Sequence, residues 1–315
     1  MNTLREAVQD YLAVRRDLGF NLREAGKGLL SFVRFMERQG AAYITNALAL
    51  DWAQQASAGQ PQAGARRLSF VRGFARYRSA TDPRTQVPPT GLLPFQPKRA
   101  RPYLYSDEEI ERLLRAALDM PHRYERGALL PWVYYCLFGL LSVTGLRLGE
   151  ARNLELQDVD LEAGVLTVRG AKFGKTRLVP LHTSTCQVLA EYLARRQEHW
   201  AGRPVSSYLF VSSWGNRLDS GQIHRAFYVL SRQIGLRGAS DSHGPRLHDF
   251  RHRFAVKTLI QWYRGGHDVE HHLPELATYL GHTHVADTYW YLTAVPELLH
   301  LAAQRVEQAK GGCTS

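Results

Sequence analysis

Two pairs of residues, each spaced three apart, could place an arginine where it binds an anion. Arg147 and Glu150 lie three residues apart in "TGLRLGEAR", directly after the most apolar stretch of the chain. On a helix these two residues share a face, so the carboxylate could hold the guanidinium in place. His248 and Arg251 have the same spacing in "RLHDFRHRFA", where we expect a helix to begin. A helix N-terminus offers unpaired N–H groups and a positive dipole, and both suit a phosphate.

Two further segments contribute a lysine, a histidine and tyrosines. Lys172 lies at the turn of a predicted β-hairpin, "GAKFGKTRLVPL", from which a long cationic side chain can reach into a groove. In "YLGHTHVADTYWYLT", His282 follows a glycine and Tyr291 comes nine residues later. Each signal is weak alone, because an exposed ion pair, a solvated lysine or a packed tyrosine would also account for it.

The composition indicates a globular protein with an anionic partner. A length of 315 residues favours two domains, and a formal net charge of +11 favours a polyanion such as nucleic acid. Cys136, Cys186 and Cys313 form no CxxC pair, so we expect neither a disulfide framework nor a cysteine zinc site, and a reducing cytoplasm fits. The stretch 129–146 has the length of a membrane helix, but Pro131 and the charged segment after it favour a buried core helix.

The first ninety residues predict a small helical domain. Leu4, Val8 and Leu12 are spaced four apart, and a second apolar stripe runs over residues 29–36 before a glycine. Thr45 can cap a third helix, and "AGARRLSFVRGFARYRSA" predicts a fourth.

Positive charge concentrates at the end of this region. Between residues 66 and 101, nine Lys or Arg stand against a single Asp. Phe70, Phe74 and Tyr77 give the fourth helix an apolar side, so we expect its arginines to face outward and follow phosphates. The segment "DPRTQVPPTGLLPFQPKRARP", with six prolines, predicts an extended basic linker. The residues predicted to contact phosphates are Arg66, Arg67, Arg72, Arg76, Lys98, Arg99, Arg101 and, in the hairpin, Lys175.

The rest of the chain predicts helices around a few strands. Ser106 and Glu109 have the spacing of a capping box that opens a helix. The runs "GVLTVRG", "TRLVPL" and "YLFVS" predict three short strands, and helices resume from Ser220. The predicted fold is mainly α with a small antiparallel β-sheet. Residues 1–93 form a helical domain, residues 94–103 a basic linker, and residues 104–315 an α+β domain.

The order of these elements resembles that of the tyrosine recombinases, or phage-integrase family. TGLRxGE, a hairpin lysine before VPL, HxxRH, LGH and a tyrosine nine residues beyond that histidine follow one another between about Tyr103 and Glu297. The helical N-terminal region is similar to the family's core-binding domain. The resemblance implies an enzyme that cleaves and rejoins DNA through a covalent 3′-phosphotyrosine.

The resemblance also implies a role for each matching residue. Arg147 and Arg251 match the two arginines that clamp the phosphate, and Glu150 matches the acidic residue that supports the first of them. Two planar, permanently charged guanidinium groups suit a pentacoordinate phosphorus with extra negative charge. Tyr291 matches the nucleophile, and His248 could accept its phenolic proton.

The lysine and the remaining tyrosines are assigned in the same way. Lys172 matches the general acid that protonates the leaving 5′ oxygen, and Lys175 competes for that role because it lies nearer to "RLVPL". His282 matches a position that holds histidine or tryptophan and would contact the phosphate oxygens. Tyr279 and Tyr289 would then pack or form hydrogen bonds.

The partner implied by the resemblance is a double-stranded DNA site. Four protomers would hold two such sites by exchanging C-terminal helices, with sister recombinases or DNA-bending proteins as further partners and no membrane. The tail has an apolar stripe of Leu298, Leu299, Ala302 and Val306, which could equally pack on its own domain. No GxxxxGK[ST] loop or acidic metal-binding cluster is evident, so we expect neither ATP nor a metal cofactor.

Three alternatives stay open. The chain could be a DNA-binding regulator that keeps the fold without cutting, or a type IB topoisomerase that relaxes DNA as a monomer. It could also be a zinc enzyme, although the sequence has no HExxH and glycines and a proline interrupt the helix that would carry the ligands. The candidate zinc ligands are His267, His271, His272, His282 and His284.

Overall fold

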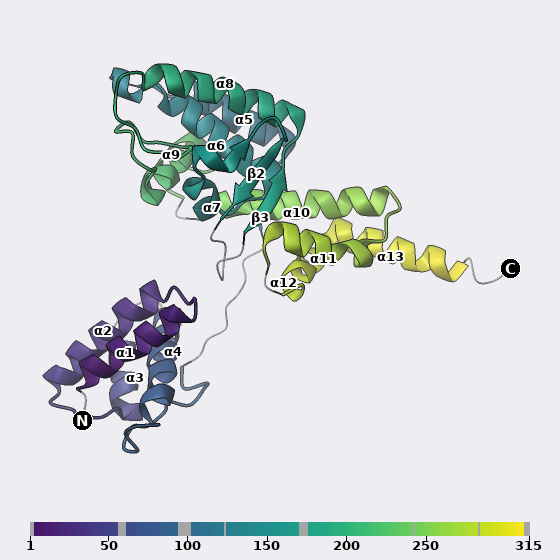
Figure 1. Ribbon diagram of the computed structural model, residues 1–315. Helices are drawn as coiled ribbons and strands as arrows, with labels where there is room; N and C mark the ends of the chain where they lie inside the picture. Colours follow the sequence, from purple (N-terminus) through teal and green to yellow (C-terminus); the bar gives the residue numbers. More distant parts are fainter. Residues whose placement is uncertain are drawn as a thin grey trace. The chain divides into compact units, whose positions relative to one another are not determined.

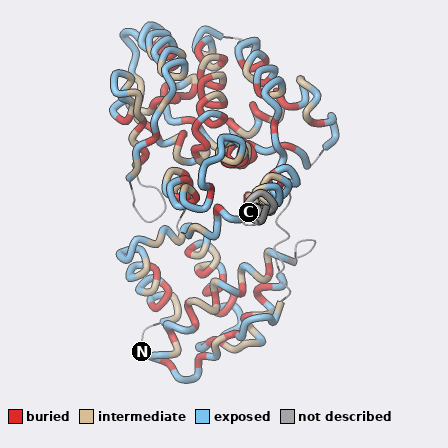
Figure 2. Tube along the Cα trace, turned by 90° about the vertical axis from the view of Figure 1, so that its right-hand side faces the viewer, coloured by how far each residue is buried: buried red, intermediate tan, exposed pale blue. Residues whose placement is uncertain are grey.

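The computed structural model describes residues 3–55, 61–93, 102–122, 124–169, 176–241, 243–282 and 284–311, without the side chains of 61, 293, 294 and 306–311. The chain forms two compact units, residues 1–100 and 101–315 (Figure 1). In each unit the buried residues line the inner faces of the helices, and the outer faces are exposed (Figure 2).

The first unit is helical. Phe32, Trp52 and Phe74 are buried at the centre of its core. Thr45 caps the third helix as predicted, because its Oγ1 accepts a hydrogen bond from the amide of Leu48 at 3.2 Å. The helices are α1 (Leu4–Asp17), α2 (Arg23–Arg38), α3 (Asn46–Gln54) and α4 (Pro61–Arg78).

The second unit packs helices around a small sheet. The predicted capping box of Ser106 and Glu109 opens its first helix. The helices are α5 (Asp107–Leu118), α6 (Leu130–Thr144), α7 (Leu148–Asn153), α8 (Thr183–His199), α9 (Ser220–Gln233), α10 (Leu247–Arg264), α11 (Val269–Leu280), α12 (Ala286–Ala294) and α13 (Pro296–Gly311). The unit also contains two short 3₁₀ helices, η1 (Glu125–Gly127) and η2 (Leu156–Asp158). The sequence analysis did not predict α8.

Helix α6 runs through the core of this unit. Its residues Val133, Leu137 and Leu140 are buried among α5, α8 and α10. The stretch 125–144 is long and apolar enough to cross a membrane, but most of it is buried inside the unit. The structure therefore confirms the predicted core helix.

The sheet has three antiparallel strands in the order β1 (Val159–Asp160), β2 (Val165–Val168) and β3 (Arg177–Pro180). Residue 168 of β2 pairs with residue 177 of β3, as the predicted hairpin requires.

The predicted strand "YLFVS", residues 208–212, is wrong. Its residues form only isolated bridges, such as the one between Glu155 and Tyr208. The side chain of Arg196 donates to the carbonyl of Tyr208, and the hydroxyl of Tyr192 donates to the carbonyl of Leu209. Side chains of α8 thus donate to carbonyls that would otherwise accept hydrogen bonds from a neighbouring strand.

Helix α10 joins two clusters of buried residues. Leu247 and Phe250, in its first turn, belong to the core around α6. Ala255 and Leu259, further along, belong to a separate cluster with α11, α12 and α13. The residues between them lie where the two clusters meet, and this is where the candidate site is found.

Candidate active site

A sharp turn after α6 places Arg147 and Glu150. Gly145 has a positive φ of 61°, and a Cβ atom there would approach the ring of Phe254 to 2.7 Å, so the turn requires glycine. Arg147 precedes α7, and its amide donates to Oε2 of Glu150 at 2.9 Å. Its Nη1 donates to Oε1 of the same carboxylate at 2.8 Å, which is the predicted pair.

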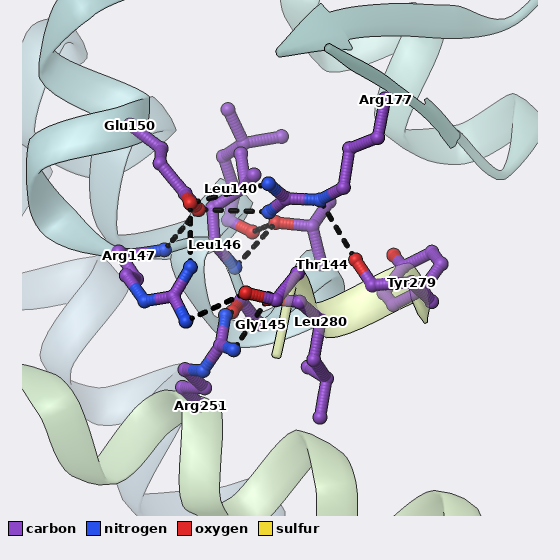
Figure 3. Close-up of polar contacts among 11 residues, drawn as sticks. Leu140, Thr144, Gly145, Leu146, Arg147, Glu150, Arg177, Arg251, Tyr279 and Leu280 are labelled. Carbon is purple, nitrogen blue, oxygen red and sulfur yellow. Dashed lines mark hydrogen bonds and ion pairs between the residues drawn. The ribbon is translucent and has the colours of Figure 1, made fainter. Parts of the chain in front are cut away.

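A second guanidinium, from β3, shares this carboxylate. Arg177 donates from Nη2 to Oε2 of Glu150 at 2.8 Å and from Nη1 to Oε1 at 3.1 Å (Figure 3). Burial raises the pKa of Glu150, but the hydrogen bonds from Arg177 and Arg147 outweigh burial and hold this pKa below its ordinary value. The carboxylate is therefore ionised at neutral pH. The sequence analysis did not assign Arg177.

Arg251, in the first turns of α10, is buried, and the residue is 2% exposed. Its Nη1 donates to the carbonyl of Gly145 at 2.9 Å and its Nη2 to the carbonyl of Leu280 at 2.5 Å (Figure 3). Burial, and then the charge of Arg147, lowers the pKa of Arg251 to about 10, so it stays protonated at neutral pH. Within the described ranges its hydrogen bonds go to carbonyl groups and not to a carboxylate.

Three guanidinium groups bind three consecutive carbonyls at the end of α11. Arg177 Nε donates to the carbonyl of Tyr279 at 2.8 Å, Arg251 to that of Leu280, and Arg147 Nη2 to that of Gly281 at 3.0 Å. These carbonyls carry the negative end of the helix dipole. A Cβ atom on Gly281 would come within 2.9 Å of Nη1 of Arg177, so the glycine of "LGH" makes room for this arrangement.

Tyr291, on α12, lies near this arginine cluster. It is 1% exposed and close enough to interact electrostatically with Arg251. Its ring lies nearly parallel to that of His282, with centroids 6.2 Å apart. His282 is fixed by a 2.7 Å hydrogen bond between its Nδ1 and Oγ1 of the buried Thr288. The structure thus gathers Tyr291, His282 and both predicted clamp arginines.

His248 lies on the same helix as Arg251, near its start. Desolvation by the surrounding protein lowers the pKa of His248, and the charge of Arg251 lowers this pKa further, so the imidazole is neutral near pH 7. Its ring is 4.7 Å from that of His252, which in turn lies 5.5 Å from the ring of Tyr291. His252 was not assigned from the sequence, although its spacing of four residues from His248 places both on one helix face.

The two other tyrosines of this region differ from Tyr291. Tyr279 stacks on Phe254 at 5.3 Å, and burial raises its pKa to about 12. Tyr289 is 47% exposed. These surroundings fit the packing role predicted for Tyr279 and leave Tyr289 on the surface.

Two of the α4 arginines that were predicted to contact phosphates are used inside the first unit. Arg67 lies over the ring of Trp52, 3.9 Å from its centroid. Arg72 donates to the carbonyls of Pro88 and Pro89 at 2.7 and 2.8 Å. Both are half-buried, so the expectation that they face outward is wrong. The guanidinium of Arg72 thus holds the segment after α4 against that helix.

The remaining basic residues of the prediction fall into two groups. Arg66 and Arg76 are exposed, as expected, although Arg66 forms an ion pair with Glu24. The others lie outside the described residues. They are Lys98, Arg99, Arg101, Lys172 and Lys175.

The histidines considered as zinc ligands form no metal-binding group in the described residues, although the rings of His267 and His271 lie 6.0 and 5.4 Å from that of His272. His267 precedes α11 and so does not share a helical turn with His271. His272 pairs with Glu275 at 2.8 Å. In the parts of the chain that the structure describes, no three His, Cys, Asp or Glu side chains are grouped as metal ligands would be. Pro274 lies inside α11 without ending it, so the expected interruption there is wrong.

The C-terminal helix begins by packing on its own unit. Leu298 is fully buried in the cluster around α10, and Arg264 pairs with Glu297 at 2.7 Å. Leu299, by contrast, is 51% exposed. The side chain of Val306 lies outside the described residues, so only part of the predicted stripe can be placed.

Comparison with known proteins agrees with this fold. The model of the Phage integrase family matches residues 104–297. The protein y4rB of Sinorhizobium fredii, named as an integrase/recombinase, is 64% identical over 98% of each chain. Tyrosine recombinase XerC of Azotobacter vinelandii is 30% identical over 76% of this chain and 75% of its own. The chain therefore belongs to the phage integrase family, the tyrosine recombinases, as the order of its motifs predicted.

A solved structure extends the likeness to both units. The Tn1549 transposon integrase, in complex with transposon right end DNA, has a TM-score of 0.65 at 15% identity. The match covers 98% of this chain and 99% of that one. This likeness concerns the fold, which is mainly helical with a small antiparallel sheet, as predicted.

Proposed function

We propose that this protein is a site-specific recombinase that cleaves and rejoins DNA through a covalent 3′-phosphotyrosine on Tyr291. The observation that carries the proposal is the environment of Arg251, a buried guanidinium whose described partners are carbonyls. Glu150 interacts with Arg251 electrostatically but does not pair with it in the described residues. A buried guanidinium without a paired anion is costly, and a DNA phosphate beside Arg251 and Arg147 would supply that anion. Tyr291 is close enough to Arg251 to interact with it electrostatically, so the proposed nucleophile would lie near that phosphate.

The proposed reaction balances without an external energy source. The phenolic oxygen of Tyr291 forms a bond to phosphorus as the bond to the 5′ oxygen breaks. The neutral imidazole of His248 takes the phenolic proton, and Lys172 or Lys175 gives a proton to the leaving oxygen. Arg147 and Arg251 stabilise the charge on the non-bridging oxygens. A second 5′ hydroxyl then reverses the step and joins a new strand.

Cleavage by Tyr291 requires a rearrangement, because the residue is only 1% exposed. We propose that DNA binding displaces the segment 282–291 enough to present the hydroxyl. The same burial favours a second candidate function, a DNA-binding regulator that does not cut.

The proposal extends to domains and assembly. Residues 1–93 would form the core-binding domain, 94–103 the linker and 104–315 the catalytic domain. Four protomers would hold two DNA sites through exchange of C-terminal helices, in integration, excision or resolution of a mobile element. A lambda integrase tetramer bound to a Holliday junction is one of the similar solved structures.

A trapping experiment tests the proposal and separates the two candidates. The Tyr291→Phe chain selects duplexes from a random-sequence pool, and the selected sequence is rebuilt as a nicked duplex whose cleaved fragment diffuses away. The unaltered chain should form a covalent complex that survives SDS, whereas Tyr291→Phe should bind the duplex and form none. Binding without any covalent complex of the unaltered chain would support the regulator instead.

A further inference from the structure

We propose that Arg177 is a positioning residue, which ties the carboxylate of Glu150 to the end of α11 and so sets Arg147 and His282 around the phosphate. The inference rests on the function proposed above and adds a residue to it. Arg177 lies on β3, remote in sequence from both of its partners, and its side chain is 11% exposed.

The first half of the argument concerns Glu150. Arg177 and Arg147 each donate to this carboxylate, and Arg177 does so through two nitrogens. A forked, charge-assisted pair of this kind fixes the orientation of the carboxylate as well as its charge. Glu150 also accepts from the amide of Arg147, so its orientation sets that of the arginine. Without Arg177, a carboxylate that is 9% exposed would keep a single guanidinium partner.

The second half concerns α11. Nε of Arg177 holds the carbonyl of Tyr279, one of the last in the helix. The helix ends at Leu280 and is capped by Gly281, which has a φ of 65°. The amide of His282 donates back to the carbonyl of Ala277 at 2.9 Å. His282 is thus part of the cap that Arg177 secures. Its ring then stacks near Tyr291, so a shift of the cap would move the nucleophile too.

Arg177 also links the site to the hairpin. It is the first residue of β3, two positions after Lys175 and five after Lys172. Arg177 anchors the start of β3 to Glu150 and α11, close in sequence to the two lysines considered as the general acid. The side chain of Arg177 therefore connects β3, the carboxylate of Glu150 and the end of α11, whose relative positions matter for the proposed reaction.

Three variants of the full chain test this role. Arg177→Met removes both interactions, and Arg177→Lys keeps a charge but not the fork. Arg169→Met is the matched control, because Arg169 follows β2 in the same hairpin and forms its described ion pair, at 2.6 Å, with the buried Asp158 and not with Glu150. The measurements are trapping rate at saturating nicked duplex, duplex affinity, and hydrogen exchange without DNA.

For Arg177→Met we expect trapping to be roughly ten- to a hundredfold slower than in the unaltered chain, because charge-assisted hydrogen bonds are lost. The affinity for the duplex should stay within about twofold of that of the unaltered chain. The amides of Gly281 and His282 should exchange faster than in the unaltered chain. Arg177→Lys should recover part of each effect, and Arg169→Met should match the unaltered chain.

The outcomes separate this inference from the proposed function. If the unaltered chain forms no covalent complex, the exchange measurement still decides whether Arg177 secures the cap. Unchanged exchange at residues 281 and 282 in Arg177→Met, or a trapping rate equal to that of Arg169→Met, would overturn the proposal. If Arg177→Met does not fold, Arg177→Lys decides, and it must show faster exchange and slower trapping than the unaltered chain.

Discussion

Replacing Glu150 by glutamine keeps the size of the side chain and removes a negative charge shared by two guanidinium groups. The carboxylate is 9% exposed, and its partners Arg177 and Arg147 are 11% and 32% exposed. Breaking a buried ion pair by removing one partner costs about 3–5 kcal/mol, and the partial exposure of Arg147 places the expected cost near the lower end, about 3 kcal/mol. At about 2–4 °C per kcal/mol for a unit of this size, the melting temperature should fall by about 6–12 °C.

Thermal unfolding followed by tryptophan fluorescence measures this loss, since five of the six tryptophans lie in residues 101–315. Glu111→Gln is the control, because Glu111 pairs with Arg115 on the surface, where such pairs contribute less than about 1 kcal/mol. The folded-state pKa of Glu150 is depressed, so its contribution is complete above its ordinary pKa of 4.5 and is lost as the pH falls through the folded value. The difference between Glu150→Gln and the unaltered chain should therefore shrink below about pH 4.5. A melting temperature within the range of Glu111→Gln at neutral pH would refute this account of the cluster.

Three further outcomes are expected. Tyr289→Phe should still form the covalent complex and Tyr291→Phe should not, and the reverse result in an SDS gel would show that the nucleophile has been assigned to the wrong helix face. Because the pKa of His248 is lowered, the trapping rate should be maintained at pH 6.5 and fall only at more acidic pH. The His248→Gln chain should trap more slowly and lose this fall in rate at acidic pH. If its pH profile matched that of the unaltered chain, His248 would not be the base. Deleting the chain from Val306 onward should spare DNA binding and weaken cooperative assembly, and unchanged cooperativity in a gel-shift series would contradict helix exchange.

The residues that the sequence placed correctly owe their positions to local structure. Arg147 and Glu150 meet because three residues separate them at the start of a helix, and Thr45 and Ser106 cap helices through bonds that reach three residues ahead. Such contacts depend on spacing alone, so the motif predicts them. The order of motifs then predicted which of these local units come together.

The residues that the sequence analysis missed owe their roles to distant partners. Arg177 matters because of Glu150 and a carbonyl 102 residues away, and nothing in "TRLVPL" signals either contact. His252 gains its place from the ring of Tyr291. Spacing along the chain cannot reveal contacts of this kind.

The missed elements have comparable causes. Helix α8 has a buried stripe of Leu189, Tyr192 and Arg196, and the arginine interrupts the apolar pattern that would have predicted it. Strand β1 is two residues long, too short for alternation to show. The run 208–212 has the composition of a strand because it is buried, but side chains of α8 satisfy two of its carbonyls.

The most direct test of the account identifies the atom that becomes joined to DNA. The covalent complex trapped on the nicked duplex is digested with nuclease and protease, and the peptides are sequenced by mass spectrometry. The account predicts a nucleotide joined through its 3′ phosphate to the phenolic oxygen of Tyr291 and to no other residue. A modification on Tyr289, Tyr279 or a serine would contradict it.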